Sequence, residues 1–511
     1  MQQEITEGKR RIAKNTMLLY VRMFFMMAVS LYTSRIVLDV LGVDDFGLYN
    51  VIGGVVAMFS LISGSLSSSI SRFLTFELGK GEISQLTKTF SASFIMHTSL
   101  AIFLFLLMET VGLWFVNNKM NIPEERLFAA NIVYQLSILV CMLNLTQVPY
   151  RASIISHERM NIYAYVGILE VLFKLCLIYL LLYVPFRDNL IAYAIILAVW
   201  SIALQLWYRY YCKKHFIECK LHIERDRSIY KRLLSYSLWD FIGQFCYTGN
   251  SQGINILINM FFGVIINASR AVAYQVENAI LQFSNNFMTA VQPQIVKSFA
   301  SGDTDRFFQL IRESCRYSFY LLFIVSLPVI LEAEYILSLW LVEVPTYAAL
   351  FLRCIICITL YNSFRDPIIK GVHATGNIKF MNLTSSLYSA LTFLPVVYIL
   401  YYLKFPVWVC FVVQGFNVLV CSWFELWSLK REIIFSIINF YSCIILRTIM
   451  VSLVCAIVPM LVIGWLEPSF LRLCVTIVVC VLSSCLIIFY WGMDKSLRNN
   501  VILLFKSKLH F

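Results

Sequence analysis

Long apolar segments separated by short polar connectors run through the whole chain. Each has at least 20 residues, which as a helix is enough to cross a hydrocarbon core of about 30 Å. They lie near residues 13–37, 47–72, 89–116, 126–150, 160–184, 190–212, 234–262, 266–296, 308–331, 345–369, 379–403, 406–429, 440–465 and 470–492. The pattern predicts an all-α, polytopic membrane protein with about 14 transmembrane helices.

Composition agrees with this interpretation. The chain of 511 residues is 60% hydrophobic and 14% charged, whereas a soluble domain of that size needs far more polar surface. The polar stretch Met1–Asn15 leads into a segment that is too long for a signal peptide and lacks a small-residue cleavage site. We therefore expect the first helix to be retained.

The basic residues predict the orientation. About 30 of the 41 Lys and Arg fall at the two termini or on alternate connectors, namely 72–88, 151–159, 209–232, 297–316, 365–379 and 430–431. The opposite connectors hold about five and carry acids instead. By the positive-inside rule, both termini are cytoplasmic. The same scatter over short loops explains the net charge of +12 without a nucleic-acid partner.

The chain contains a weak internal repeat. When VLGVDDFGLYN is aligned without gaps to FFGVIINASRA, Gly42 meets Gly263 and Gly81 meets Gly302. At nearly the same shift, Pro149 meets Pro367. Each half then holds about six helices, an even number that leaves both halves in the same orientation. Two like-oriented lobes favour a transporter that works by rocking, with its site between the lobes.

Ionisable side chains inside a bilayer are costly and persist where a cavity or a partner holds them. Glu170 and Lys174 are four residues apart on one helical face, so they predict a local ion pair or a charged element that faces a cavity. Arg22 and Arg353 lie deep within their segments, whereas Arg35, Arg270 and Arg447 lie near segment ends, where snorkelling to the headgroups is also open.

The segments near 234–262 and 266–296 are the most polar. The second carries a stripe with a spacing near seven, which predicts contact with water, substrate or a neighbouring helix rather than with lipid. The amides and carboxylates of these two segments that we expect to face a cavity are Asp240, Asn255, Asn259, Gln275, Glu277, Asn278 and Asn285.

Several kinds of chemistry find no support in the sequence. It has no GxxxxGK[ST], HExxH or GxSxG motif, which disfavours an ATPase, a zinc protease and an α/β-hydrolase. Cys354 and Cys357 form a lone CxxC inside an apolar segment, which is weak evidence for a metal or redox site. We expect a protein that is not an enzyme and has no cofactor and no metal.

Two segments carry a family resemblance. TSRIVLDVLGVDDFGLYNVIGGVVAMFSLISGSLSSSISRFLTFELGKGE and INILINMFFGVIINASRAVAYQVENAILQFSNNFMTAVQPQIVKSFASGD resemble matching segments of the polysaccharide flippases of the MOP (MATE-like) superfamily, the Wzx-type O-antigen or lipid-linked oligosaccharide translocases. The resemblance implies two six-helix lobes with two extra helices. On this chain they become an N-lobe (1–212), a cytoplasmic amphipathic linker (213–233), a C-lobe (234–430), and helices 13 and 14 with a cytoplasmic tail (431–511).

The resemblance also implies a substrate and a location. The substrate is an oligosaccharide on undecaprenyl pyrophosphate, moved from the cytoplasmic to the outer leaflet of a bacterial inner membrane by alternating access. A polysaccharide polymerase and chain-length proteins are the expected partners, besides membrane lipids. Arginine suits a pyrophosphate because its planar fork binds phosphate bidentately. We therefore expect Arg22, Arg35, Arg270 and Arg353 to bind it, and the amides Asn255, Asn259, Gln275, Asn278 and Asn285 to meet sugar hydroxyls.

A coupling ion, H⁺ or Na⁺, or the membrane potential is expected to drive the cycle. The candidate coupling groups are Asp240, Glu277 and Glu170 with its neighbour Lys174. Three alternatives remain open. A lipid II flippase shares the fold and the pyrophosphate. A MATE-type drug/cation antiporter needs acids in its cavity, typically including one in helix 1, where this chain has Arg22 instead. A non-transporting membrane scaffold has no need of the polar stripe.

Overall fold

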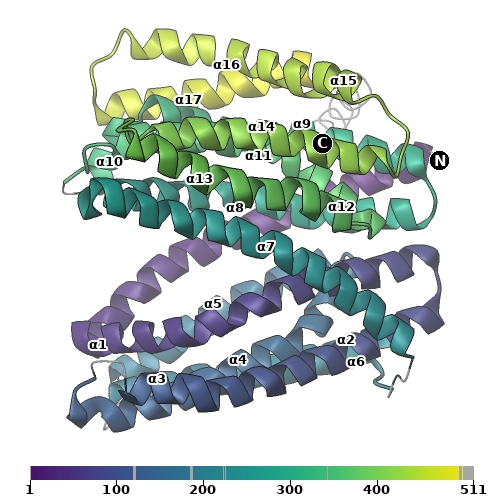
Figure 1. The fold of residues 1–511 in the computed structure, drawn as a ribbon, viewed down its shortest axis with the longest axis vertical. Helices are drawn as coiled ribbons and strands as arrows, with labels where there is room; N and C mark the ends of the chain where they lie inside the picture. The colour runs from purple at the N-terminus through teal and green to yellow at the C-terminus, as the bar shows by residue number, and fades with distance from the viewer. Residues whose placement is uncertain are drawn as a thin grey trace, which may run out of the picture. The chain divides into compact units, whose positions relative to one another are not determined.

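The computed structural model describes residues 2–118, 122–183, 188–222, 224, 226–341, 343–493 and 498. Within these ranges, the side chains of residues 2–10, of scattered positions between 30 and 68, and of 177, 178, 182 and 264 lie outside the description. Every regular element in the described part of the chain is a helix, as predicted (Figure 1). The chain divides into two compact units. The N-terminal unit comprises Met1–Phe241 with Val296–Gly302, and the C-terminal unit comprises Ile242–Ile295 with Asp303–Phe511.

Helix α4 is central to the N-terminal unit. This unit holds α1 (Gln2–Lys80), α2 (Ile83–Leu107), α3 (Leu113–Asn118), α4 (Leu127–Ser156), α5 (Met160–Tyr183), α6 (Asn189–His215) and the first part of α7 (Arg227–Phe262). Helix α4 packs against α1, α2 and α6, while α5 packs against α1. The core of the N-terminal unit includes Tyr134. The Tyr134 hydroxyl donates to the carbonyl of Met108 at 2.7 Å, where α2 passes through a π-helical turn into α3.

The C-terminal unit is built around α9. It holds most of α8 (Val264–Ala300), followed by α9 (Thr304–Leu331), α10 (Ala333–Trp340), α11 (Ala348–Thr375), α12 (Lys379–Met381), α13 (Leu387–Tyr402), α14 (Val409–Lys430), α15 (Ile437–Phe440), α16 (Arg447–Ile463) and α17 (Phe470–Ile487). Helix α9 packs against α11, and α11 against α14. The two additional helices, α16 and α17, pack against each other and against α9.

The backbone at the repeat positions supports the predicted repeat. Gly42, Gly81, Gly263 and Gly302 all have φ between 76° and 84°, a region that favours glycine. Gly42 breaks the helical geometry within α1, so the first two predicted segments form one kinked helix rather than two with a loop. Pro149 and Pro367 both lie inside long helices, α4 and α11.

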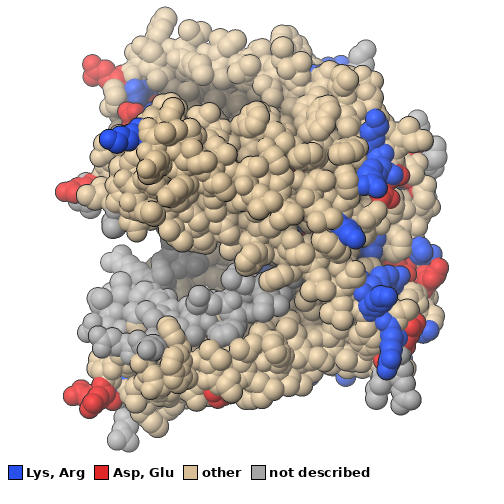
Figure 2. All heavy atoms as spheres, viewed as in Figure 1, with Lys and Arg blue, Asp and Glu red and all other residues tan. Residues whose placement is uncertain are grey.

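Charged residues are unevenly distributed over the face that Figure 2 shows. On this face, Lys, Arg, Asp and Glu are sparse along the helices and gather near the helix ends. Eleven of the described helices are long and apolar enough to cross a membrane. The predicted segments near 47–72, 234–262 and 266–296 are helical but are not among these eleven, so the count of about 14 stays a prediction.

The turn between α4 and α5 ties together the basic end of the N-terminal unit, where α1, α4 and α6 end. The Glu158 side chain is 4% exposed and accepts from Lys297 Nζ at 2.7 Å and from Arg11 Nη1 at 3.3 Å. Beside it, His157 Nε2 lies 2.7 Å from Glu218 Oε1, in the connector after α6. The last turn of α8 is thereby fixed to this unit.

Candidate substrate site

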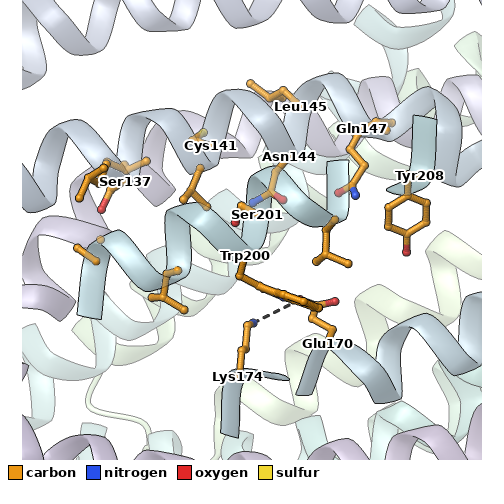
Figure 3. Close-up of a pocket in the computed structure, with 18 of the residues that line it drawn as sticks. Ser137, Cys141, Asn144, Leu145, Gln147, Glu170, Lys174, Trp200, Ser201 and Tyr208 are labelled. Carbon is orange, nitrogen blue, oxygen red and sulfur yellow. Dashed lines mark ion pairs between the residues drawn. The ribbon is translucent and has the colours of Figure 1, made fainter. Parts of the chain in front are cut away.

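A cavity of about 670 Å³ lies inside the N-terminal unit, between α1, α4, α5 and α6 (Figure 3). Its apolar wall includes Val56, Leu145, Leu197 and Leu204. The polar and aromatic residues that line it are Tyr49, Ser67, Ser137, Asn144, Gln147, Arg151, Glu170, Lys174, Trp200, Ser201 and Tyr208. A size of several hundred Å³ with a few polar groups on an apolar wall is typical of a ligand pocket.

Helix α5 contributes an ion pair to this cavity. Lys174 Nζ lies 3.3 Å from Glu170 Oε1, and the dashed line in Figure 3 marks the contact. The two side chains are 41% and 32% exposed, respectively, so the cavity leaves both accessible. The local pair that the spacing predicts is therefore present, and both partners line the cavity.

Helix α4 contributes Arg151, because the helix continues through Pro149 to Ser156. The sequence interpretation ended this helix at residue 150 and assigned 151–159 to a loop, which was wrong. A proline removes one backbone hydrogen bond, but the packing of α4 against its neighbours keeps the helix going. Arg151 thus lies on the cavity wall rather than in a connector.

Arg22 and Arg151 face the same aromatic ring. The guanidinium carbon of Arg22 lies 4.2 Å from the centroid of the Tyr163 ring, and that of Arg151 lies 6.0 Å from it. Arg22 also runs against α5 at Gly167, where a Cβ would overlap its Nε. Residues of α1, α4 and α5 that are far apart in the sequence therefore place two permanent positive charges next to each other.

Two buried donors of the cavity lining, Gln147 Nε2 and Trp200 Nε1, have no hydrogen-bond partner among the described residues. Arg22 Nε also has none there, but Arg22 does not line the cavity, and its Nε lies against Gly167. Gln147 is 5% exposed and Trp200 lines the cavity directly. Buried donors are nearly always paired in folded proteins, so donors left over at a cavity are suited to ligand oxygens. With Arg22, Arg151 and Lys174 against Glu170, the local balance favours an anion.

In the C-terminal unit, α8 brings several of the predicted residues together. Arg270 is 3% exposed, lies 4.2 Å from the Tyr274 ring centroid and donates to Asn255 Oδ1 on α7. Glu277 on α8 accepts from the Thr359 hydroxyl on α11. Four of the amides that we expected to meet sugar hydroxyls are exposed, namely Asn259, Gln275, Asn278 and Asn285.

The remaining predicted residues lie elsewhere. Arg353 donates to the carbonyl of Ile330 at 3.0 Å and pairs with Glu334 at 3.1 Å, where α9 meets α10. Asp240 is buried on α7 within the N-terminal unit, whereas Arg270 and Glu277 belong to the C-terminal unit. The side chain of Arg35 lies outside the described residues.

Residues 12–299, more than half of the chain, match the family described as polysaccharide biosynthesis protein. The chain belongs to this family. No curated protein sequence matches it.

Solved structures show the fold of this polysaccharide biosynthesis protein. A mutant of the Vibrio cholerae MATE transporter VcmN is 12% identical, with a TM-score of 0.69 over 84% of this chain and 97% of that one. A multidrug resistance MATE transporter of the MOP superfamily, in an outward-facing conformation, is 12% identical, with a TM-score of 0.67 over 83% and 96%. The chain has the MATE fold.

Sequence reasoning missed a second arginine beside a helix proline. Arg365 in α11 donates to both carboxylate oxygens of Glu425 on α14, at 2.6 and 3.0 Å, and Ser385 adds a bond of 2.9 Å to the same carboxylate. The sequence interpretation counted Arg365 with a basic connector, although α11 continues to Thr375. A signal was available, because an arginine lies two residues from the repeat proline in each half.

Proposed function

We propose that this transporter flips oligosaccharide linked to undecaprenyl pyrophosphate from the cytoplasmic to the outer leaflet of a bacterial inner membrane. The observation that carries the proposal is the cavity of the N-terminal unit, where the positive charges of Arg151 and Lys174 outweigh the one carboxylate of Glu170. The family supplies independent support, because a polysaccharide biosynthesis protein with a transporter fold needs a polysaccharide-related cargo.

Arg151 and Arg22 supply the chemistry for the pyrophosphate. Guanidinium groups remain charged at all physiological pH values and donate in a fork that matches phosphate oxygens. Their position on the Tyr163 ring holds them in place before the substrate arrives, which lowers the entropic cost of binding. The prenyl chain stays in the lipid, since its transfer into a polar cavity is unfavourable.

The orientation follows from the basic ends of the helices. We place the ends that carry the Lys- and Arg-rich turns, and with them both termini, in the cytoplasm. The cycle is alternating access, driven by H⁺, Na⁺ or the membrane potential, where each charge moved across 100 mV is worth about 2.3 kcal/mol. Glu170, Asp240 and Glu277 remain the candidate coupling groups. A polysaccharide polymerase and chain-length proteins are the partners that we expect for this function.

A cation antiporter fits the cavity less well. Cationic drugs need an available carboxylate, whereas Glu170 is already paired with Lys174 and two arginines lie nearby. A lipid II flippase shares the pyrophosphate, so the cargo itself must decide between lipid II and a polysaccharide precursor. A scaffold without transport activity predicts that the cavity charges are dispensable.

The test is native mass spectrometry of the gently purified full chain. We expect a co-purified polyprenyl-pyrophosphate glycan that is lost in Arg151→Gln and Arg22→Gln. The matched control is Arg447→Gln, since Arg447 donates to the Trp491 carbonyl in the C-terminal unit. A bound mass that contains a peptide, together with complementation of a lipid II flippase mutant, would assign lipid II instead. Phospholipid alone, with binding of cationic dyes, would overturn the proposal in favour of the antiporter.

A further inference from the structure

The cavity has two chemically different regions along its length. Arg151 and Tyr208 line it nearer the basic end, whereas Asn144 and Trp200 line it deeper. On α4, Arg151 lies seven residues beyond Asn144, and on α6 Tyr208 lies eight beyond Trp200. At 1.5 Å per residue, each separation is roughly 10–12 Å. An anion held by Arg151 therefore leaves the Trp200 region to a group attached to that anion.

Trp200 is a rigid aromatic surface in this deeper region. It stacks on Phe173 of α5, with ring centroids 4.5 Å apart and planes at 16°. Phe173 is the neighbour of Lys174, so Trp200 packs on α5 beside the Glu170–Lys174 pair, as Figure 3 shows. A tryptophan held in this way contacts a ligand with little loss of side-chain entropy.

Polar groups surround this aromatic surface on three helices. Asn144 and Gln147 come from α4, Glu170 and Lys174 from α5, and Ser201 from α6. Gln147 Nε2 and Trp200 Nε1 are buried donors without a partner among the described residues. An aromatic face bordered by amides, hydroxyls and a charged pair matches a pyranose ring, which has an apolar C–H face and a rim of hydroxyls.

We infer that Trp200, Gln147, Asn144 and the Glu170–Lys174 pair form a saccharide subsite, which binds the sugar next to the pyrophosphate. The inference rests on the proposed function, because Arg151 must hold the pyrophosphate for the subsite to be filled in this order. The two unpaired donors require acceptor oxygens, so the bound sugar presents hydroxyl or N-acetyl oxygens to them. The subsite thereby makes affinity depend on the glycan and not on the lipid alone.

The test compares two probes in native mass spectrometry of the full chain. One is undecaprenyl pyrophosphate, and the other is the same lipid carrying a single N-acetylglucosamine. In Trp200→Leu we expect binding of the sugar-bearing probe to fall about tenfold, through loss of stacking and of one donor. Binding of the sugar-free probe should stay within about twofold, and Trp200→Phe should lie between Trp200→Leu and the wild type.

Two further variants keep the test decisive. Trp207→Leu is the matched control, because Trp207 lies on α6, stacks on Tyr211 and does not line the cavity. Gln147→Met removes the buried amide at similar length and should weaken only the sugar-bearing probe, even if Trp200→Leu does not fold. Equal effects on both probes, or no effect on either, would overturn the subsite while leaving the proposed function standing. Failure of the wild type to bind either probe would overturn both.

Discussion

Replacing Gly167 by alanine tests the placement of Arg22 without touching the arginine itself. A Cβ at this position would overlap Arg22 Nε and lie 2.9 Å from its Cζ and 3.0 Å from Nη2. The guanidinium is the end of a flexible side chain, so it moves while α5 stays in place. Gly167→Ala should therefore displace Arg22 from the Tyr163 ring.

The effect on stability is the difference of two opposing contributions. Losing the cation–π contact, which has a length of 4.2 Å here, costs about 0.5–2 kcal/mol. Replacing a glycine inside a helix by alanine stabilises the folded protein by about 0.5–1 kcal/mol. We expect a net loss of at most about 1.5 kcal/mol, small enough for the protein to fold and be purified.

The effect on binding should be larger. A charge-assisted hydrogen bond contributes about 1.5–3 kcal/mol, and a tenfold change corresponds to about 1.4 kcal/mol. Undecaprenyl pyrophosphate should therefore bind roughly ten- to a hundredfold more weakly to Gly167→Ala in a titration of the purified protein. Thermal unfolding of the same samples measures the stability change.

Gly415→Ala in α14 is the matched control. A Cβ there meets nothing within 4 Å, so it should bring the gain in helix propensity alone and leave binding unchanged. If Gly167→Ala binds the lipid like the wild type and unfolds like Gly415→Ala, the position of Arg22 on Tyr163 has no role in holding the pyrophosphate.

Three further predictions concern the other charged groups. Glu170→Gln removes the carboxylate of the cavity and should raise affinity for undecaprenyl pyrophosphate roughly fivefold in the same titration; weaker binding would contradict the anion site. Glu425→Gln leaves Arg365 buried without its full charge partner and should lower the stability by about 3–5 kcal/mol in thermal unfolding. The double variant Arg365→Gln/Glu425→Gln should lose less stability than the sum of the two single variants. Glu158→Gln weakens the contact with Lys297, so hydrogen exchange of residues 296–302 should become faster; unchanged exchange there would mean that the α8 end is held by packing alone.

The helices were predictable because long apolar segments report on the bilayer rather than on any tertiary contact. The ion pair of Glu170 with Lys174 was predictable for a similar reason, since one turn of helix sets its geometry. The alignment of the two halves paired Gly42 with Gly263, and the structure adds that both have a positive φ, which glycine tolerates.

The cavity was not predictable, because it depends on contacts between distant segments. Nothing local places Arg22 over Tyr163 or Trp200 on Phe173. Arg151 was misplaced because a proline and a basic residue together are typical of a helix end. Only the packing of α4 shows that the helix continues, and with it the arginine moves from a connector to the wall of the cavity.

Pro149 also determines how easily the cavity wall deforms. It has no N–H to donate to the carbonyl of Leu145, one turn earlier, and Leu145 itself lines the cavity. Helix α4 can therefore bend at Pro149 without breaking a backbone hydrogen bond, and such bending changes the width of the cavity. Pro367, the repeat partner of Pro149, lies inside α11 and lets that helix bend in the same way. Each unit therefore has one helix that bends at a repeat proline.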